Sequence, residues 1–180
     1  MTPGSDPNET ASDGTKVGPG ASEACAEKAI TNMASDTDPK GASFAKLQLR
    51  SPKQTTKSIK LKWTKVPNAK KYVLYGNKCG KTTKPKRIAT ITNINQTTAT
   101  FTSVAGKKVV KGTYYKFIIV ALDKNNKVVS TSKLIHVATK SNKIGNHKSV
   151  KVSKAVIKKA AKLKKGKSLK LKAKAVQQSK

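Results

Sequence analysis

The chain has 180 residues, enough for one ordinary domain with additional segments, and its 39 basic and 8 acidic side chains give a net charge of +31. No stretch of the sequence is long and apolar enough to span a membrane, and the N-terminus lacks the basic-then-apolar pattern of an export signal. Residues 1–45 carry seven acidic side chains and three lysines, a net charge of −4, whereas residues 46–180 carry 36 basic side chains and one acidic, a net charge of +35. Such a basic surface attracts polyanions at long range, although the same lysines could simply keep the domain soluble.

Residues 1–21 are rich in Gly, Pro, Ser, Asp and Thr, which predicts a disordered leader. A short helix followed by a linker is expected over residues 22–43. Ser22 can cap the helix, which is too short to be stable alone and must pack on another element. Its apolar stripe consists of Cys25, Ala26, Ala29, Ile30 and Met33. Asp36 and Asp38 follow, but no glutamate completes an EF-hand loop after them, so they indicate a turn.

From residue 44 onward the pattern changes to short segments of alternating polarity, which are typical of β-strands. Residues 58–64 alternate most clearly, with Ile59, Leu61 and Trp63 expected inward and the intervening lysines outward. Strands are predicted over residues 44–50, 58–64, 71–76, 87–92, 97–104, 111–123 and 128–139. Segments recurring every ~10–15 residues without a helix between them predict an antiparallel β-sandwich.

The segment 111–123 is the longest nearly uncharged apolar run of the basic region. Its odd-numbered residues from Tyr115 to Ala121 lie on one side of a strand, and its even-numbered residues from Tyr114 to Val120 lie on the other. Both sides are largely apolar, so we expect a central strand in the middle of the sandwich core.

Several residues recur in the order and spacing of a known module. Trp63 stands in the second predicted strand with Pro67 four residues later, the third contains Tyr72 and Tyr75, and the sixth contains the run 112–121. In this respect residues 44–140 resemble a fibronectin type III domain. The resemblance implies an all-β fold, a fibronectin type III-like antiparallel β-sandwich of about seven strands in two sheets, here with a short N-terminal helix and a partial β segment at the C-terminus.

Beyond a linker at residues 141–148, residues 149–153 and 167–175 alternate again. The intervening segment 154–165 is ambiguous, because its apolar residues recur at helical spacing. The lysine-rich runs resemble modular surface and secreted proteins of Gram-positive gut bacteria, in which such a domain is often followed by a bacterial Ig-like domain. That resemblance implies that residues 149–180 are an incomplete Ig-like segment and favours a strand over a helix at 154–165.

The basic region lacks the groups that catalysis requires. After residue 44, Asp123 is the only carboxylate side chain, so catalysis by paired carboxylates has no second member. His136 and His147 are isolated, and no phosphate-binding glycine loop, nucleophile elbow or metal-spaced Cys/His set occurs. We therefore expect no catalytic, cofactor-binding or metal residues and no cofactor.

Cys25 and Cys79 are the only cysteines. They could form one disulfide between the N-terminal helix and the loop after the third strand, or remain two thiols, because spacing cannot decide between these states.

Two functions are compatible with these features. The first is a non-catalytic structural or adhesive module of a bacterial cell-surface or secreted protein. The second is non-sequence-specific polyanion binding, in which basic side chains contact phosphates. The candidate contact residues are Lys60, Lys62, Lys84, Lys86, Arg87 and Lys116. Candidate partners are an anionic cell-wall polymer, a glycan, a host protein or nucleic acid. Sequence-specific nucleic-acid recognition is not expected, because arginine and aromatic residues are scarce.

Overall fold

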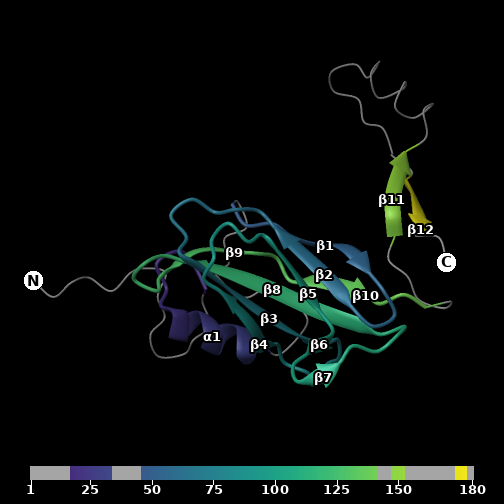
Figure 1. Ribbon diagram of the computed structural model, residues 1–180, viewed down its shortest axis with the longest axis horizontal. Coiled ribbons are helices and arrows are strands. Elements are labelled where there is room, and N and C mark those ends of the chain that lie inside the picture. The colour runs from purple at the N-terminus through teal and green to yellow at the C-terminus, as the bar shows by residue number, and fades with distance from the viewer. Residues whose placement is uncertain (1–16, 34–45, 142–146, 153–172, 178–180) are drawn as a thin grey trace, which may run out of the picture.

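In the computed structural model of the chain, residues 17–33, 46–141, 147–152 and 173–177 are described. This part of the chain is mostly antiparallel β-sheet, with one short helix, α1 (Glu23–Thr31) (Figure 1). The main strands are β1 (Leu49–Gln54), β2 (Ile59–Trp63), β3 (Lys71–Lys78), β4 (Lys86–Ile91), β5 (Thr98–Phe101), β8 (Tyr114–Leu122), β9 (Val128–Thr131) and β10 (Ile135–Ala138). Two short strands, β6 (Ser103–Val104) and β7 (Lys107–Lys108), form a hairpin between β5 and β8.

The strands form two facing sheets. One has the order β1-β2-β5, and the other has the order β10-β8-β3-β4, with β9 also paired to β8. All of these pairings are antiparallel. The arrangement confirms the predicted all-β fold, a fibronectin type III-like antiparallel β-sandwich with a short N-terminal helix.

Apolar side chains from both sheets meet in the sandwich interior. Ile59, Leu61 and Trp63 of β2 are buried, as their alternation predicts. The Trp63 ring meets the Tyr72 ring of β3 edge to face, with centroids 5.8 Å apart, so this contact joins the two sheets. Gly76 of β3 lies opposite Phe117, and a Cβ atom there would come within 2.7 Å of the phenyl ring. The close packing of β3 on β8 therefore requires glycine at this position.

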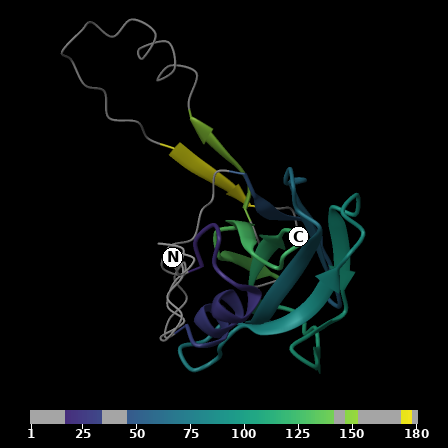
Figure 2. The same cartoon turned by 90° about the vertical axis from the view of Figure 1, so that its left-hand side faces the viewer.

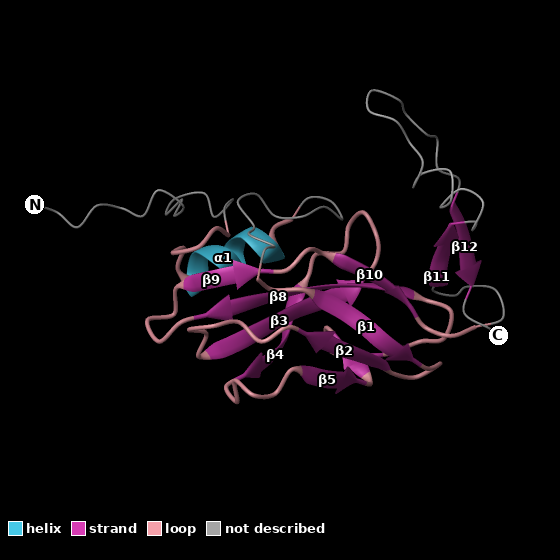
Figure 3. Cartoon of the chain, turned by 90° about the horizontal axis from the view of Figure 1, so that it is seen from above, coloured by secondary structure: helices cyan, strands magenta, loops and turns pink. Residues whose placement is uncertain are grey.

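A second apolar core covers the outer face of the larger sheet. Ile118, Val120 and Leu122 of β8 are buried against α1 and the residues that precede it. The predicted helical stripe faces this sheet, and its members Ala26, Ala29 and Ile30 belong to the cluster. Figure 3 shows α1 on one side of the β8–β3 sheet and the β1–β2–β5 sheet on the other, and Figure 2 shows α1 beside β4. The double burial of β8 explains why both of its sides are apolar.

The residues before α1 are part of this packing. Val17 and Ala21 are fully buried, and the Gly20 N–H donates to the Val128 carbonyl at 2.7 Å. Ser22 caps the helix as predicted, because its Oγ accepts the Cys25 N–H at 3.2 Å. The leader predicted over residues 1–21 is therefore too long: residues 17–21 cover β9 instead of lying in solvent. Its first sixteen residues lie outside the described part of the chain.

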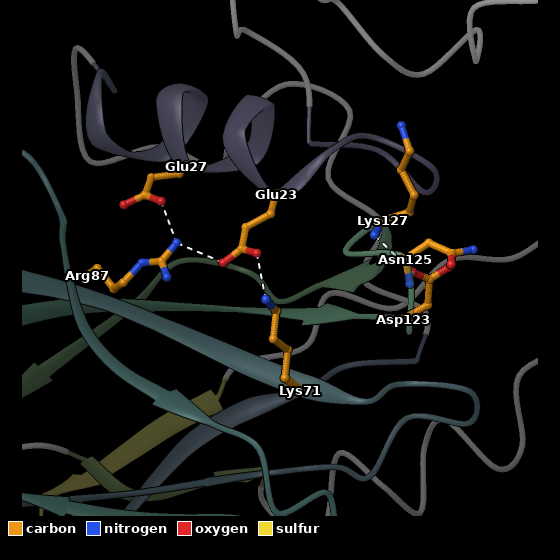
Figure 4. A network of polar contacts seen from close by, with 7 residues as sticks. All are labelled: Glu23, Glu27, Lys71, Arg87, Asp123, Asn125 and Lys127. Atoms are coloured by element: carbon orange, nitrogen blue, oxygen red, sulfur yellow. Dashed lines mark hydrogen bonds and ion pairs between the residues drawn. The ribbon is translucent and has the colours of Figure 1, made fainter.

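Ion pairs fasten α1 to the larger sheet (Figure 4). Glu23 accepts from Lys71 Nζ of β3 at 2.6 Å and from Arg87 of β4 at 2.9 Å, and Arg87 also pairs with Glu27. Burial raises the pKa of Glu23, but the hydrogen bonds and positive charges of Lys71 and Arg87 outweigh burial, so the net pKa lies below its ordinary value of 4.5. These contacts complement the apolar packing. The negative charge of Glu23, in the first turn, also interacts favourably with the helix dipole.

Several strand boundaries differ from the prediction, and the segment predicted as one strand at 128–139 forms two strands, β9 and β10. The first strand was predicted at residues 44–50, but β1 spans Leu49–Gln54. Upstream of β1, the Thr64 hydroxyl donates to the Lys46 carbonyl and accepts the Gln48 N–H, and the Thr64 N–H donates to the Gln48 carbonyl at 3.1 Å. Side-chain and backbone hydrogen bonds together therefore hold this segment beside the end of β2. In the C-terminal part, β11 (His147–Val152) and β12 (Ala173–Gln177) form an antiparallel pair. The ambiguous segment 154–165 lies outside the described residues.

Replacing Ile30 by alanine should destabilise the whole sandwich, because Ile30 is fully buried between α1 and the larger sheet. We expect the free energy of unfolding to fall by about 2–5 kcal/mol in a denaturant titration, still in a single transition. Ala24→Ser, at an exposed position of the same helix, is the matched control and should change it by less than about 0.5 kcal/mol. A stability unchanged by Ile30→Ala would show that α1 is not part of the folding unit.

The contribution of Glu23 to stability should depend on pH. Because its folded pKa is lowered, the contribution is complete above the ordinary value of 4.5 and is lost as pH falls through the folded pKa. Wild type should therefore be more stable than Glu23→Gln at neutral pH, and the difference should shrink progressively as the pH falls below 4.5. Denaturant titrations of both proteins across this range measure it. A constant difference at all pH values would contradict the lowered pKa.

Candidate polyanion-binding surface

The six predicted contact residues do not form one site. Lys60 and Lys62 are exposed on the outer face of the three-stranded sheet. Lys84 and Lys86 are exposed on the other sheet's side, in the loop after β3 and at the start of β4. Of the two remaining candidates, Lys116 is buried, and Arg87 is exposed at the surface but ion-paired with α1. The polyanion contacts themselves stay a prediction for the four exposed lysines.

The prediction that Lys116 points outward is wrong. Lys116 is only 2% exposed, and its Nζ donates to the carbonyl oxygens of Gly80, at 3.4 Å, and Thr83. The loop after β3 closes over this end of β8, where the alternation pattern alone predicts that the Lys116 side chain is exposed to solvent. Period-2 alternation assigns Lys116 to the outer face of its sheet, but it cannot reveal that a loop covers that face.

Arg87 is committed to the helix that covers the sheet. Its guanidinium contacts both Glu23 and Glu27 (Figure 4). Burial lowers the pKa of Arg87, but hydrogen bonds and charge attraction from the glutamates and Tyr75 outweigh burial and raise it overall. Two carboxylates already share this guanidinium, so a polyanion would have to compete with them.

The register of β1 on β2 creates a denser basic cluster than the sequence pattern indicates. Arg50 lies directly opposite Lys62, and Lys53 lies directly opposite Lys60. All four side chains are exposed, and we call them the four-cation face. Opposite residues of an antiparallel pair point to the same side and have Cβ atoms about 4.5–5.5 Å apart. The face therefore concentrates four positive charges on two neighbouring strands.

No carboxylate among the described residues neutralises the four-cation face. The acidic residues there are Glu23, Glu27 and Asp123. The two glutamates hold α1 to the larger sheet, and Asp123 Oδ1 accepts the N–H groups of Asn125 and Lys127 at 2.8 and 2.9 Å in its own turn (Figure 4). Like charges directly opposite each other destabilise a strand pair, so these four cations contribute repulsion to the fold.

Sequence analysis missed two members of the face, Arg50 and Lys53. The predicted first strand ended at Arg50. A bulge between Arg50 and Lys53 also breaks the simple alternation, which therefore does not indicate that both side chains lie on the outer side of the sheet. The local signal was weak: an arginine and a lysine three residues apart around Pro52. Their position opposite Lys62 and Lys60 depends on the strand register, which the sequence pattern does not provide.

The described residues bring together no catalytic or metal-binding constellation. They contain no group of three or more His, Cys, Asp and Glu side chains that could hold a metal ion. His136 is exposed on β10. No disulfide joins Cys25 and Cys79: the first is buried in α1 and the second is half-buried after β3. No helix in the described ranges is long and apolar enough to cross a membrane.

A shallow hollow lies between the β2–β3 turn and the β8–β9 turn. Lys65, Lys70 and Lys124 line it together with Asp123. Asp123 is the only carboxylate in the lining, and its Oδ1 already accepts two backbone N–H groups of its turn. The lining of the hollow therefore offers no second carboxylate to pair with Asp123.

Comparison with known proteins finds similarity only among solved structures. No family model matches the sequence, and no curated protein matches it. Among solved structures, the chain is similar to the FN5 domain of Drosophila Lar, with 18% identity and a TM-score of 0.39 over 52% of this chain and 92% of that one. It is also similar to the fn3 domain of human collagen alpha-1(XX), with 14% identity and a TM-score of 0.42 over 63% and 99% of the two chains.

A pectate lyase, PelI from Erwinia chrysanthemi, is similar at 16% identity and a TM-score of 0.41, over 51% of this chain and only 28% of the enzyme. The chain thus spans just over a quarter of that protein's length. Of these three structures, the FN5 domain of Lar and the fn3 domain of collagen are covered over nearly their whole length. The fibronectin type III-like fold itself rests on the strand order and register described above.

Proposed function

We propose that the chain is a non-catalytic structural or adhesive module of a bacterial cell-surface or secreted protein. The main support is that the described carboxylates all take part in structural contacts. The described carboxylates are engaged in the α1 ion pairs and in one turn, and the sandwich interior is apolar. A sandwich whose described carboxylates are engaged in structural contacts suits a spacer that holds loops and sheet faces away from a surface.

The sequence context supports the same proposal. The lysine-rich runs resemble those of modular surface and secreted proteins of Gram-positive bacteria, and residues 149–180 resemble the beginning of an Ig-like domain. The proposed order of modules is a leader, the helix-covered sandwich, a linker and this Ig-like segment. The pairing of β11 with β12 is compatible with that order.

A second function, polyanion binding, is favoured by a specific observation. The four-cation face presents Arg50, Lys53, Lys60 and Lys62 together without a described carboxylate nearby. Residues 46–180 as a whole carry a net charge of +35. Such a charge would draw an anionic wall polymer or nucleic acid to the surface and hold it by contacts to charged groups. The two functions are compatible, because an adhesive module can bind through charge.

The surface assignment predicts that an antibody raised against the sandwich labels intact source cells or detects the protein in the culture medium. Labelling of intact cells and of lysed cells should be similar for a surface protein. A ribosomal protein is a suitable control, because it should be labelled only after lysis. A protein found only inside lysed cells would contradict the proposed location.

Polyanion binding should depend strongly on salt. The affinity of the full chain for an anionic polymer should fall steeply between about 50 and 200 mM salt, because binding releases counterions. Fluorescence anisotropy with labelled poly(glycerol phosphate) measures this, and uncharged dextran is the control that should not bind. An affinity that is the same at both salt concentrations, or an absence of binding at the lower one, would exclude the second function.

A further inference from the structure

We propose that the four-cation face is the docking surface for a flexible, base-free phosphodiester chain, which lies across β1, β2 and β5. This inference rests on the second proposed function, polyanion binding, and adds the location of the contact and the chemistry of the partner. The evidence for it is the register of three strands, the absence of a neutralising carboxylate among the described residues, and the kinds of side chain on this face.

The face consists of two similar rows. In the first row, Arg50 lies opposite Lys62, which in turn lies opposite Thr98 of β5. Each row thus combines two cations with one hydroxyl, and opposite residues share one side of the sheet. The hydroxyl can donate a hydrogen bond to an anionic oxygen beside the cations.

The second row has the same composition type as the first, two cations and one hydroxyl, and lies beside it on the sheet. Lys53 lies opposite Lys60, and Lys60 lies opposite Thr100. Lys60 and Lys62 are two residues apart on β2, so the rows are about 7 Å apart. A polymer with a flexible backbone can place successive anionic groups on successive rows, one between the cations of each.

The side chains of the face favour a base-free partner. Binding of single-stranded nucleic acid usually relies on aromatic rings on which bases stack. Trp63 and Phe101, on β2 and β5, point toward the sandwich core rather than to this face. Tyr114, the exposed aromatic side chain of the described chain, lies on β8 of the other sheet. Three of the four cations are lysines, which contact phosphate as point charges.

The repulsion within the face also indicates a ligand. The cations that take part in structural contacts have partners within the fold: Lys71 and Arg87 bind glutamates, and Lys116 binds backbone carbonyls. On the four-cation face two like-charged pairs stand opposite each other with no described structural partner. Like charges directly opposite each other destabilise a strand pair, and such locally unfavourable arrangements are expected at functional sites.

The test compares two variants of the full chain with equal loss of charge. The face variant carries Arg50→Gln, Lys53→Gln, Lys60→Gln and Lys62→Gln. The matched control carries Lys107→Gln, Lys108→Gln, Lys111→Gln and Lys124→Gln, at exposed positions on β7 and in the loops on either side of β8. Binding of labelled poly(glycerol phosphate) is measured against salt concentration. We expect the face variant to bind roughly tenfold or more weakly, with a log–log salt slope smaller by about 3, and the control to retain most of the affinity and slope.

The outcomes separate the site from the function. If wild type binds in a salt-dependent manner but both variants lose affinity equally, the face is not the docking surface, while polyanion binding stands. If wild type does not bind at all, the proposed function fails first. Single-stranded DNA with the same number of phosphates is a second probe. DNA bound over roughly tenfold more tightly than the polymer would overturn the base-free partner, because stacking would then contribute.

Misfolding can be distinguished from loss of the site. The face variant removes two opposed like-charge pairs, so its denaturation midpoint should equal or exceed that of wild type at low salt. A charge-preserving variant, with Lys53→Arg, Lys60→Arg and Lys62→Arg, should bind the polymer as wild type does. Loss of binding in this variant as well would overturn a contact that depends on charge.

Discussion

The burial of β8 on both of its faces is the constraint on which the rest of the structure depends. One face supplies Phe117 and Ile119 to the sandwich interior, and the other supplies Ile118 and Val120 to a second core under α1. A fibronectin type III-like sandwich needs only the first of these cores. The apolar outer face requires a cover, and residues 17–33 provide it, which makes the N-terminal helix a structural part of the module.

This architecture decides which charged side chains are paired and which stay exposed. Where the cover meets the sheet, Glu23 and Glu27 pair with Lys71 and Arg87. Where a loop closes over the end of β8, Lys116 donates to carbonyl groups and leaves the solvent. The three-stranded sheet has no such cover in the described chain, and its outer face retains the opposed cations. The acidic side chains stabilise one side of the module, and the other side stays basic.

This division separates a structural side from a candidate binding side. The helix-covered sheet is stabilised by apolar burial and ion pairs, both internal to the chain. The uncovered sheet presents lysine and arginine in two rows on a rigid β framework, and a rigid framework lowers the entropy lost when a ligand binds. A spacer that also adheres to an anionic polymer needs both properties, a stable body and a fixed array of charge.

The sequence by itself determined the sandwich and the helix, because both depend on local patterns. Alternation placed Ile59, Leu61 and Trp63 inside, and Ser22 with its apolar stripe marked α1. Only the tertiary structure decided that Lys116 is buried and that Arg50 faces Lys62. Periodicity tells which side of a strand a residue occupies, but the cover over that side and the register between strands arise from contacts between segments distant in the chain.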